Sequence, residues 1–159
     1  MTRGPIQLDV AVSYATARKG VPSATSFRRW VEAALHGRIR DADLALRIVG
    51  EDEGRALNRH YRGKDKPTNV LSFPADIGDI QLPKGVTLPL LGDIVICAPV
   101  VASEAKAQGK AVNAHYAHLT VHGVLHLLGW DHQNDAEAQA MEQLEREILA
   151  GLGLGDPYL

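Results

Sequence analysis

Apolar and polar residues alternate at the start of the chain and then change to helical spacing. Every second residue from Ile6 to Tyr14 is large and apolar, which predicts a β-strand with one buried face. After Pro22 the large apolar residues fall three or four positions apart, which predicts an amphipathic helix capped by Ser23 or Ser26 and stopped by Gly37. Its apolar stripe consists of Phe27, Trp30, Val31, Ala34 and Leu35.

The same two patterns repeat in the next part of the chain. Alternation returns from Leu44 to Gly50, helical spacing with acidic residues in the first turn follows from Glu51 to Tyr61, and Asn69 to Pro74 is again strand-like. The order is therefore strand, helix, strand, helix, strand. Because strands joined by helices usually lie parallel through right-handed crossovers, we expect these three strands to form the parallel part of one sheet.

A segment without regular spacing separates these elements from a fourth strand. The stretch from Ala75 to Pro89 is rich in Gly, Pro and Asp, which predicts a long surface loop. The apolar run from Leu90 to Pro99 then predicts a strand that returns without a helix, and so runs antiparallel. The sequence thus predicts an α+β fold with a mixed four-stranded sheet, three strands parallel and one antiparallel, in a single domain spanning residues 1–159.

Three more helices are expected in the last third of the chain, which gives about five in all. Pro99 and Gly109 bracket the first, the second runs from Val112 to about Leu128, and the third is capped by Asn134 and ends near Gly151. The final residues, 151–159, predict a loosely held tail whose leucines could dock on the body.

Composition narrows the class of protein. A chain of 159 residues with 45% hydrophobic residues fits one domain, and a net charge of −2 means that any nucleic-acid contact must come from a local patch. The single cysteine, Cys97, lies in an apolar run and predicts a buried thiol in a reducing compartment. No stretch approaches the roughly 18 apolar residues of a membrane span. We therefore expect a cytoplasmic protein without a membrane partner.

Three histidines near residue 126 have the spacing of a metal site. His122 and His126 are one helical turn apart on the same face, and Gly129 allows a reversal that brings His132 to the same ion. Three imidazoles suit one Zn²⁺, although other divalent transition metals accept them too, and they leave a coordination position open, as in catalytic sites. His118 lies one turn before His122, and a row of three histidines from His118 to His126 would span about 11 Å, too far for all three to bind one ion. We therefore expect His118 to support a ligand or to lie at the surface.

Two acidic residues each have two interpretations from sequence alone. Asp131 is adjacent to a ligand and could orient an imidazole, although an Asp after a helix also suits a turn. Asp93, at the start of the fourth strand, could carry a proton or support a ligand, or simply order its loop.

The alternative to a metal site is that His122, His126 and His132 are core or surface histidines whose spacing is coincidental.

The spacing of the histidines is that of the metal-binding helix of the zincin and metzincin proteases, with one difference. Those enzymes need a glutamate after the first histidine as general base, and Gly123 stands there instead. A zinc metallopeptidase with a base elsewhere is therefore the weaker alternative.

Three segments together carry a family resemblance. The segment "HGVLHLLGWDH" (His122 to His132) resembles the signature of the YbeY family, and "YRGKDKPTNVLSFP" (Tyr61 to Pro74) and "LGDIVICAP" (Leu91 to Pro99) match two further family blocks in the expected order. Trp130 stands where family members often have Tyr, and Asn69 where many have Asp.

The resemblance implies a zinc-dependent endoribonuclease that cleaves single-stranded RNA in the maturation of the 3′ end of 16S rRNA and in ribosome quality control. It implies that His122, His126 and His132 hold the zinc and that Arg62 is the catalytic residue outside the ligand set. Expected partners are small-subunit rRNA and, beyond it, ribosomal small-subunit proteins or assembly GTPases.

A basic cluster around Arg62 agrees with an RNA substrate. It consists of Arg59, His60, Arg62, Lys64 and Lys66. Arg62 can contact two phosphate oxygens at once and stabilise the charge that develops in the transition state, while Arg59, Lys64 and Lys66 are candidate RNA-binding residues. A solvated basic loop is the alternative. The sequence leaves open whether a metal-activated water or the 2′-hydroxyl of the RNA attacks phosphorus, and whether the protein is instead a non-catalytic ribosome-assembly factor with structural zinc.

Overall fold

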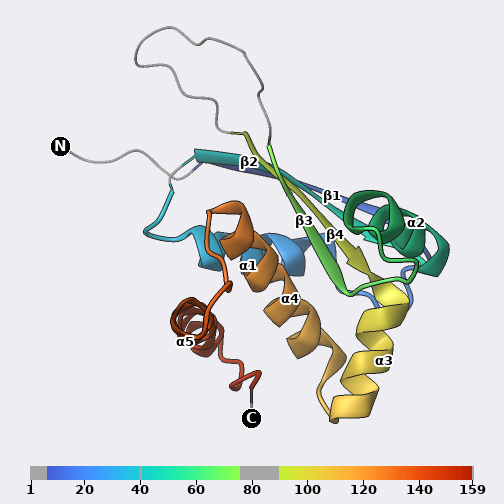
Figure 1. Ribbon diagram of the computed structural model, residues 1–159. Coiled ribbons are helices and arrows are strands. Elements are labelled where there is room, and N and C mark those ends of the chain that lie inside the picture. The colour runs from blue at the N-terminus through green and yellow to red at the C-terminus, as the bar shows by residue number, and fades with distance from the viewer. Residues whose placement is uncertain (1–6, 40, 76–89, 159) are drawn as a thin grey trace, which may run out of the picture.

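A four-stranded sheet with helices on both faces forms the body of the protein (Figure 1). The computed structural model describes residues 7–39, 41–75 and 90–158. The elements are β1 (Gln7–Ala15), α1 (Ala24–Leu35), β2 (Asp41–Val49), α2 (Glu51–Arg62), β3 (Val70–Pro74), β4 (Leu90–Cys97), α3 (Ala98–Gln108), α4 (Val112–Leu127) and α5 (Asp135–Gly151). The predicted loop from Ala75 to Pro89 falls outside the described residues apart from its first residue.

The sheet has the strand order β1-β2-β4-β3, in which β1, β2 and β4 are parallel and β3 is antiparallel to β4. The predicted α+β fold with three parallel strands and one antiparallel strand is therefore confirmed. The assignment of the antiparallel strand to β4 was wrong, because β4 rather than β3 pairs with β2. Residues Ile94–Cys97 of β4 are all buried, as a strand covered on both faces requires, so β4 takes the inner place and β3 lies at the edge.

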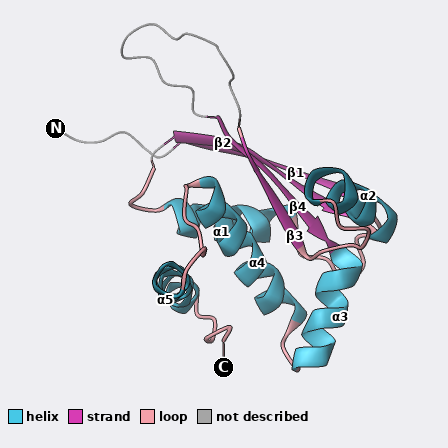
Figure 2. Cartoon of the chain, viewed as in Figure 1, coloured by secondary structure: helices cyan, strands magenta, loops and turns pink. Residues whose placement is uncertain are grey.

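Two groups of buried side chains occupy the two faces of the sheet. Helices α1, α4 and α5 lie together on one side of the strands, and α2 lies apart from them (Figure 2). On the first side Ile94 and Ile96 pack into the main core, and on the second side Val95 and Cys97 pack with Leu57 of α2. Neighbouring residues of β4 thus point to opposite faces, as a strand requires.

Helix α4 is the central helix of the main core. It packs against β3, β4 and the three helices α1, α3 and α5, and its buried residues include Tyr116, Leu119, Val121 and Leu125. A helix surrounded in this way is held rigidly, which makes it a suitable support for a site that needs fixed geometry. Among the described residues no helix is both long and apolar enough to cross a bilayer.

The segment after α5 is docked rather than loose. Leu152 and Leu154 pack against the main core, and Arg146 of α5 forms an ion pair with Asp156 at 3.0 Å. The prediction of a loosely held tail was therefore wrong for the residues up to Tyr158, and the suggestion that its leucines dock was right.

Candidate metal centre and its cleft

The structure brings the three predicted histidines together. His122 and His126 lie one turn apart on α4, with their Nε2 atoms 3.1 Å from each other, and His132 joins them from the turn that follows. One ligand nitrogen from each of the three lies within 4.8 Å of the others. The placement agrees with the spacing argument, which used only helix geometry and a glycine turn.

The turn after α4 shows why His132 returns to the helix. Gly129 has a φ of 99°, in the left-handed region that glycine tolerates. Its N–H donates to the carbonyl of His126, and the N–H of Trp130 donates to the carbonyl of Leu125 at 3.0 Å, which is the hydrogen-bond pattern of a Schellman motif. The chain therefore reverses directly after the helix.

Asp131 supports this turn through the backbone. Its Oδ1 accepts a hydrogen bond of 2.7 Å from the backbone N–H of His132. The carboxylate also lies in the cleft and acts to raise the pKa of His126, opposing the larger influences described below. Its structural role is thus the ordering of the turn that presents His132.

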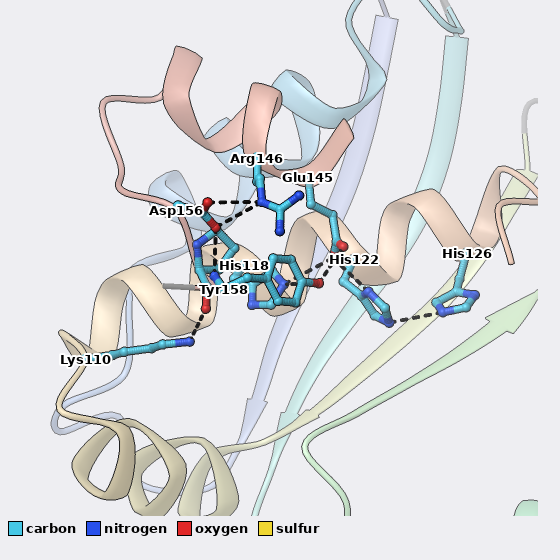
Figure 3. Close-up of polar contacts among 9 residues, drawn as sticks. Lys110, His118, His122, His126, Glu145, Arg146, Asp156 and Tyr158 are labelled. Atoms are coloured by element: carbon cyan, nitrogen blue, oxygen red, sulfur yellow. Dashed lines mark hydrogen bonds and ion pairs between the residues drawn. The ribbon is translucent and has the colours of Figure 1, made fainter. Parts of the chain in front are cut away.

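The donor chemistry of the cluster fits a zinc ion. The Nδ1 of His122 lies 2.8 Å from Oε1 of Glu145, and a carboxylate can only accept, so Nδ1 carries a proton and Nε2 has the lone pair in the neutral ring (Figure 3). Burial lowers the pKa of His126, and the imidazoles of His122 and His132 lower it further, so this ring is neutral near pH 7. Neutral imidazole nitrogens at such separations suit Zn²⁺, whose bonds to histidine are about 2.0–2.1 Å long.

Glu145 is the acidic residue beneath the cluster, and it is ionised. Burial alone raises the pKa of its carboxyl group, but hydrogen bonds from His118, His122 and Tyr158 outweigh that effect and lower the pKa to about 2. The carboxylate is therefore negatively charged near neutral pH.

The histidines form part of the wall of an open cleft with a volume of about 640 Å³. Strand β3 provides another wall, and Tyr61 and Arg62 at the end of α2 provide a third. Helix α2 ends there because Gly63 adopts a left-handed conformation with φ 71°. The structure thus brings Arg62 to the same cleft as the metal ligands, from a segment about sixty residues earlier in the chain.

Arg62 is the member of the basic cluster that lines the cleft. Among the described residues no member of the cluster has a carboxylate partner, and Asp65 is instead paired with Arg55 through two hydrogen bonds of 2.8 and 2.9 Å. The remaining candidate RNA-binding residues are exposed but do not line the cleft; they are Arg59, Lys64 and Lys66. They are close to Arg62 in the sequence but are not part of the cleft wall.

Asp93 is not brought to the histidines. In β4 it precedes Ile94, which packs in the main core with α4, so alternation directs the carboxylate of Asp93 to the opposite face of the sheet. It is exposed, and it is not among the residues that line the cleft. A direct contact of Asp93 with a metal ligand therefore has no support in this arrangement.

Two residues of the site were missed from the sequence. Tyr61 is 59% exposed in the cleft and packs against Phe73, with ring centroids 4.8 Å apart. Glu145 is fully buried, on the same face of α5 as Met141 and Ile148. A charged residue on an apolar helical stripe was the available signal for Glu145, because such a charge is retained only where partners satisfy it.

Comparison with known proteins identifies the family. Residues 12–153 match the family model described as endoribonuclease YbeY. The chain belongs to the YbeY family. This membership confirms the resemblance expected from the three sequence blocks.

Several relatives and one solved structure agree with this assignment. YbeY proteins named endoribonuclease from Stenotrophomonas maltophilia (strain R551-3) and Xanthomonas axonopodis pv. citri are 74% and 72% identical, each over 99% of this chain and 98% of the relative. The solution structure of TM1509 from Thermotoga maritima covers 91% of both chains with a TM-score of 0.58 at 22% identity. The latter likeness supports the fold.

Proposed function

We propose that this YbeY protein is a metal-dependent endoribonuclease that hydrolyses phosphodiester bonds in single-stranded RNA. His122, His126 and His132 hold one metal ion, which we take to be Zn²⁺, although other divalent transition metals suit the same donors. The observation that carries the proposal is the convergence of three imidazoles on a cleft that also contains Arg62, which has no carboxylate partner among the described residues. The family membership supports the endoribonuclease activity.

The metal site and Arg62 have complementary roles in the cleft. When bound, the metal supplies Lewis acidity toward a phosphate oxygen and lowers the pKa of water toward neutrality. The guanidinium of Arg62 donates two N–H groups to the non-bridging oxygens of the scissile phosphate. Since the transition state carries more charge on these oxygens than the substrate does, Arg62 stabilises it selectively.

Packing around Gly123 argues against a peptidase of the metzincin type. A Cβ atom at this position lies 3.2 Å from two side-chain carbons of Ile94 and 3.2 Å from Oγ of Ser72. The hydroxyl of Ser72 donates to the carbonyl of Gly123, which holds β3 close to α4. The position that carries the protease base is therefore tightly packed, and a glutamate there requires the side chains of Ile94 and Ser72 to shift.

The ribonuclease assignment is tested with metal-loaded protein and an RNA supplied both as a single strand and as a duplex. We expect cleavage of the single strand. Arg62→Ala should lower kcat by roughly 10²–10³-fold, the usual effect of losing one donor to a developing charge. Bound zinc should not change, because Arg62 is not a ligand. Arg62→Lys keeps the charge but loses the two-pronged contact, so it should restore only part of the activity. Full activity in Arg62→Ala would remove this residue from the mechanism.

Tyr61 supports a preference for single strands. An exposed aromatic ring, held against Phe73 beside a cation, offers a surface on which an unpaired base can stack. We expect Tyr61→Ala to weaken binding of a single-stranded oligoribonucleotide by about 1–3 kcal/mol, the usual contribution of one stacked base, and Tyr61→Phe to bind like the original protein. The RNA affinities of both variants and of the original protein are measured by fluorescence anisotropy in the presence of a chelator, which prevents cleavage. Equal affinities for all three proteins would show that no base stacks there.

We propose small-subunit rRNA as the biological substrate, in 3′-end maturation and ribosome quality control, as the family resemblance implies. A cytoplasmic location and contacts with ribosomal small-subunit proteins or assembly GTPases remain predictions. Accumulation of unprocessed small-subunit rRNA in cells that carry only a His132→Ala protein is the result expected.

A further inference from the structure

We propose that Glu145 is a positioning residue for the metal centre, and that Tyr158 in the C-terminal segment holds Glu145 in its working orientation. The inference rests on the proposed function in one respect, namely that the three histidines bind a metal. It adds two residues that lie outside the ligand set and outside the cleft wall formed by α2 and β3.

The carboxylate of Glu145 is fully buried, and both of its oxygens have hydrogen-bond partners (Figure 3). Its Oε1 lies 2.8 Å from Nδ1 of His122 and 3.1 Å from Nε2 of His118, and its Oε2 accepts a hydrogen bond of 2.7 Å from the hydroxyl of Tyr158. A buried carboxylate is costly unless it is satisfied in this way. An apolar residue at position 145 would avoid this cost but could not accept a hydrogen bond from His122. The arrangement therefore points to a role of Glu145 at the metal centre.

The contact with His122 determines what that histidine offers to a metal. Because Glu145 can only accept, it selects the form of His122 with the proton on Nδ1, and the lone pair of Nε2 then points toward His126. The carboxylate also makes the imidazole a stronger donor to a metal and fixes the orientation of the ring. Without it, His122 is free to place its proton on the nitrogen that must bind the ion.

The C-terminal segment carries Tyr158 to this carboxylate. The segment is anchored by the ion pair of Arg146 with Asp156 and by a hydrogen bond from Lys110, before α4, to the carbonyl of Pro157. The backbone N–H of Tyr158 also donates to Asp156 at 2.8 Å. Burial raises the pKa of Tyr158, and Glu145 raises it further, so the hydroxyl keeps the proton that it donates.

The hydrogen bonds of Glu145 join the C-terminal segment to the metal ligands. A cavity of about 120 Å³ is lined by Glu145 together with His122, His132 and Tyr158. Loss of the hydroxyl of Tyr158 leaves Oε2 of Glu145 without a hydrogen-bond partner among the described residues. The C-terminal segment is thereby coupled to a metal ligand of α4 through a single side chain of α5.

The first test compares Glu145→Gln with Glu142→Gln in zinc affinity, measured by competition with a chromophoric chelator. Both changes remove one negative charge from α5 beside the same small cavity, but Glu142 has no hydrogen bond to a histidine among the described residues. We expect Glu145→Gln to weaken zinc binding by about 10- to 100-fold, as loss of a partner behind a ligand usually does, and Glu142→Gln to bind like the original protein.

A second variant carries the test even if Glu145→Gln does not fold. Tyr158→Phe removes one hydroxyl from a side chain that is 39% exposed. We expect it to weaken zinc binding, by less than Glu145→Gln does. Long-range ¹H–¹⁵N spectra of the metal-free protein provide an independent readout. They should show His122 with its proton on Nδ1 in the original protein and a mixture of both forms in the two variants.

The outcomes separate this inference from the proposed function. Failure of the original protein to bind any divalent transition metal overturns the metal site itself. Normal zinc binding by the original protein, together with equal affinity and an unchanged His122 spectrum in folded Tyr158→Phe and Glu145→Gln, overturns only the positioning role. Loss of affinity in Glu142→Gln equal to that in Glu145→Gln also overturns it, because the effect is then one of general charge.

Discussion

RNA cleavage should fall at least about a thousandfold in His126→Ala. The two remaining histidines bind zinc too weakly to retain it, and the metal ion stabilises the transition state by several kcal/mol. His126 provides the nitrogen that lies 3.1 Å from that of His122, so its removal leaves a gap in the middle of the cluster. The measurement is kcat on single-stranded RNA, together with zinc per chain by elemental analysis. Both should fall in parallel.

His36→Ala is the matched control for this variant. His36 is exposed at the end of α1 and takes no part in the cluster, so its replacement should leave cleavage and zinc content unchanged. Cleavage that persists in purified His126→Ala would mean that the activity comes from another protein or from a metal held elsewhere.

Gly123→Glu should destabilise the protein strongly. A Cβ at this position already crowds Ile94 and Ser72 at 3.2 Å, and the rest of a glutamate would place a charge in the interface of α4 with the sheet. Overpacking costs about 1–3 kcal/mol, and an unpaired buried charge adds several more. Since about 1 kcal/mol shifts Tm by 2–4 °C for a chain of this size, we expect Tm to fall by roughly 10 °C or more.

Gly151→Glu provides the comparison for thermal unfolding. Gly151 is the last residue of α5, a Cβ there meets no atom within 4 Å, and its φ is not positive. The same new side chain should therefore change Tm by only a few degrees at that position. A Gly123→Glu protein as stable as Gly151→Glu would show that α4 does not lie against β3 and β4 as closely as described.

The three histidines could be predicted because local backbone geometry decides their positions. Helical spacing places His122 above His126, and the glycine turn returns His132, so no distant contact is needed. The order of strands was harder, because β3 and β4 compete for the place beside β2. That competition is decided by burial on both faces of the sheet, which the separate strand patterns do not reveal.

The rest of the site depends on contacts between distant segments. The basic cluster was evident, but only the end of α2 determines that Arg62 enters the cleft and that Arg59, Lys64 and Lys66 do not line it. Asp93 was considered because of its chemistry, and strand alternation turns it away from α4. Glu145 was overlooked since its partner His122 is 23 residues earlier and on another helix.

The docked position of Tyr158 has a consequence for shortened forms of the protein. The hydroxyl of Tyr158 is the hydrogen-bond partner of Oε2 of Glu145, so a chain cut after Gly151 keeps all three histidines but loses the side chain that holds Glu145. Under the role proposed for Glu145, proteolysis of the segment after α5 weakens zinc binding without removing a single metal ligand.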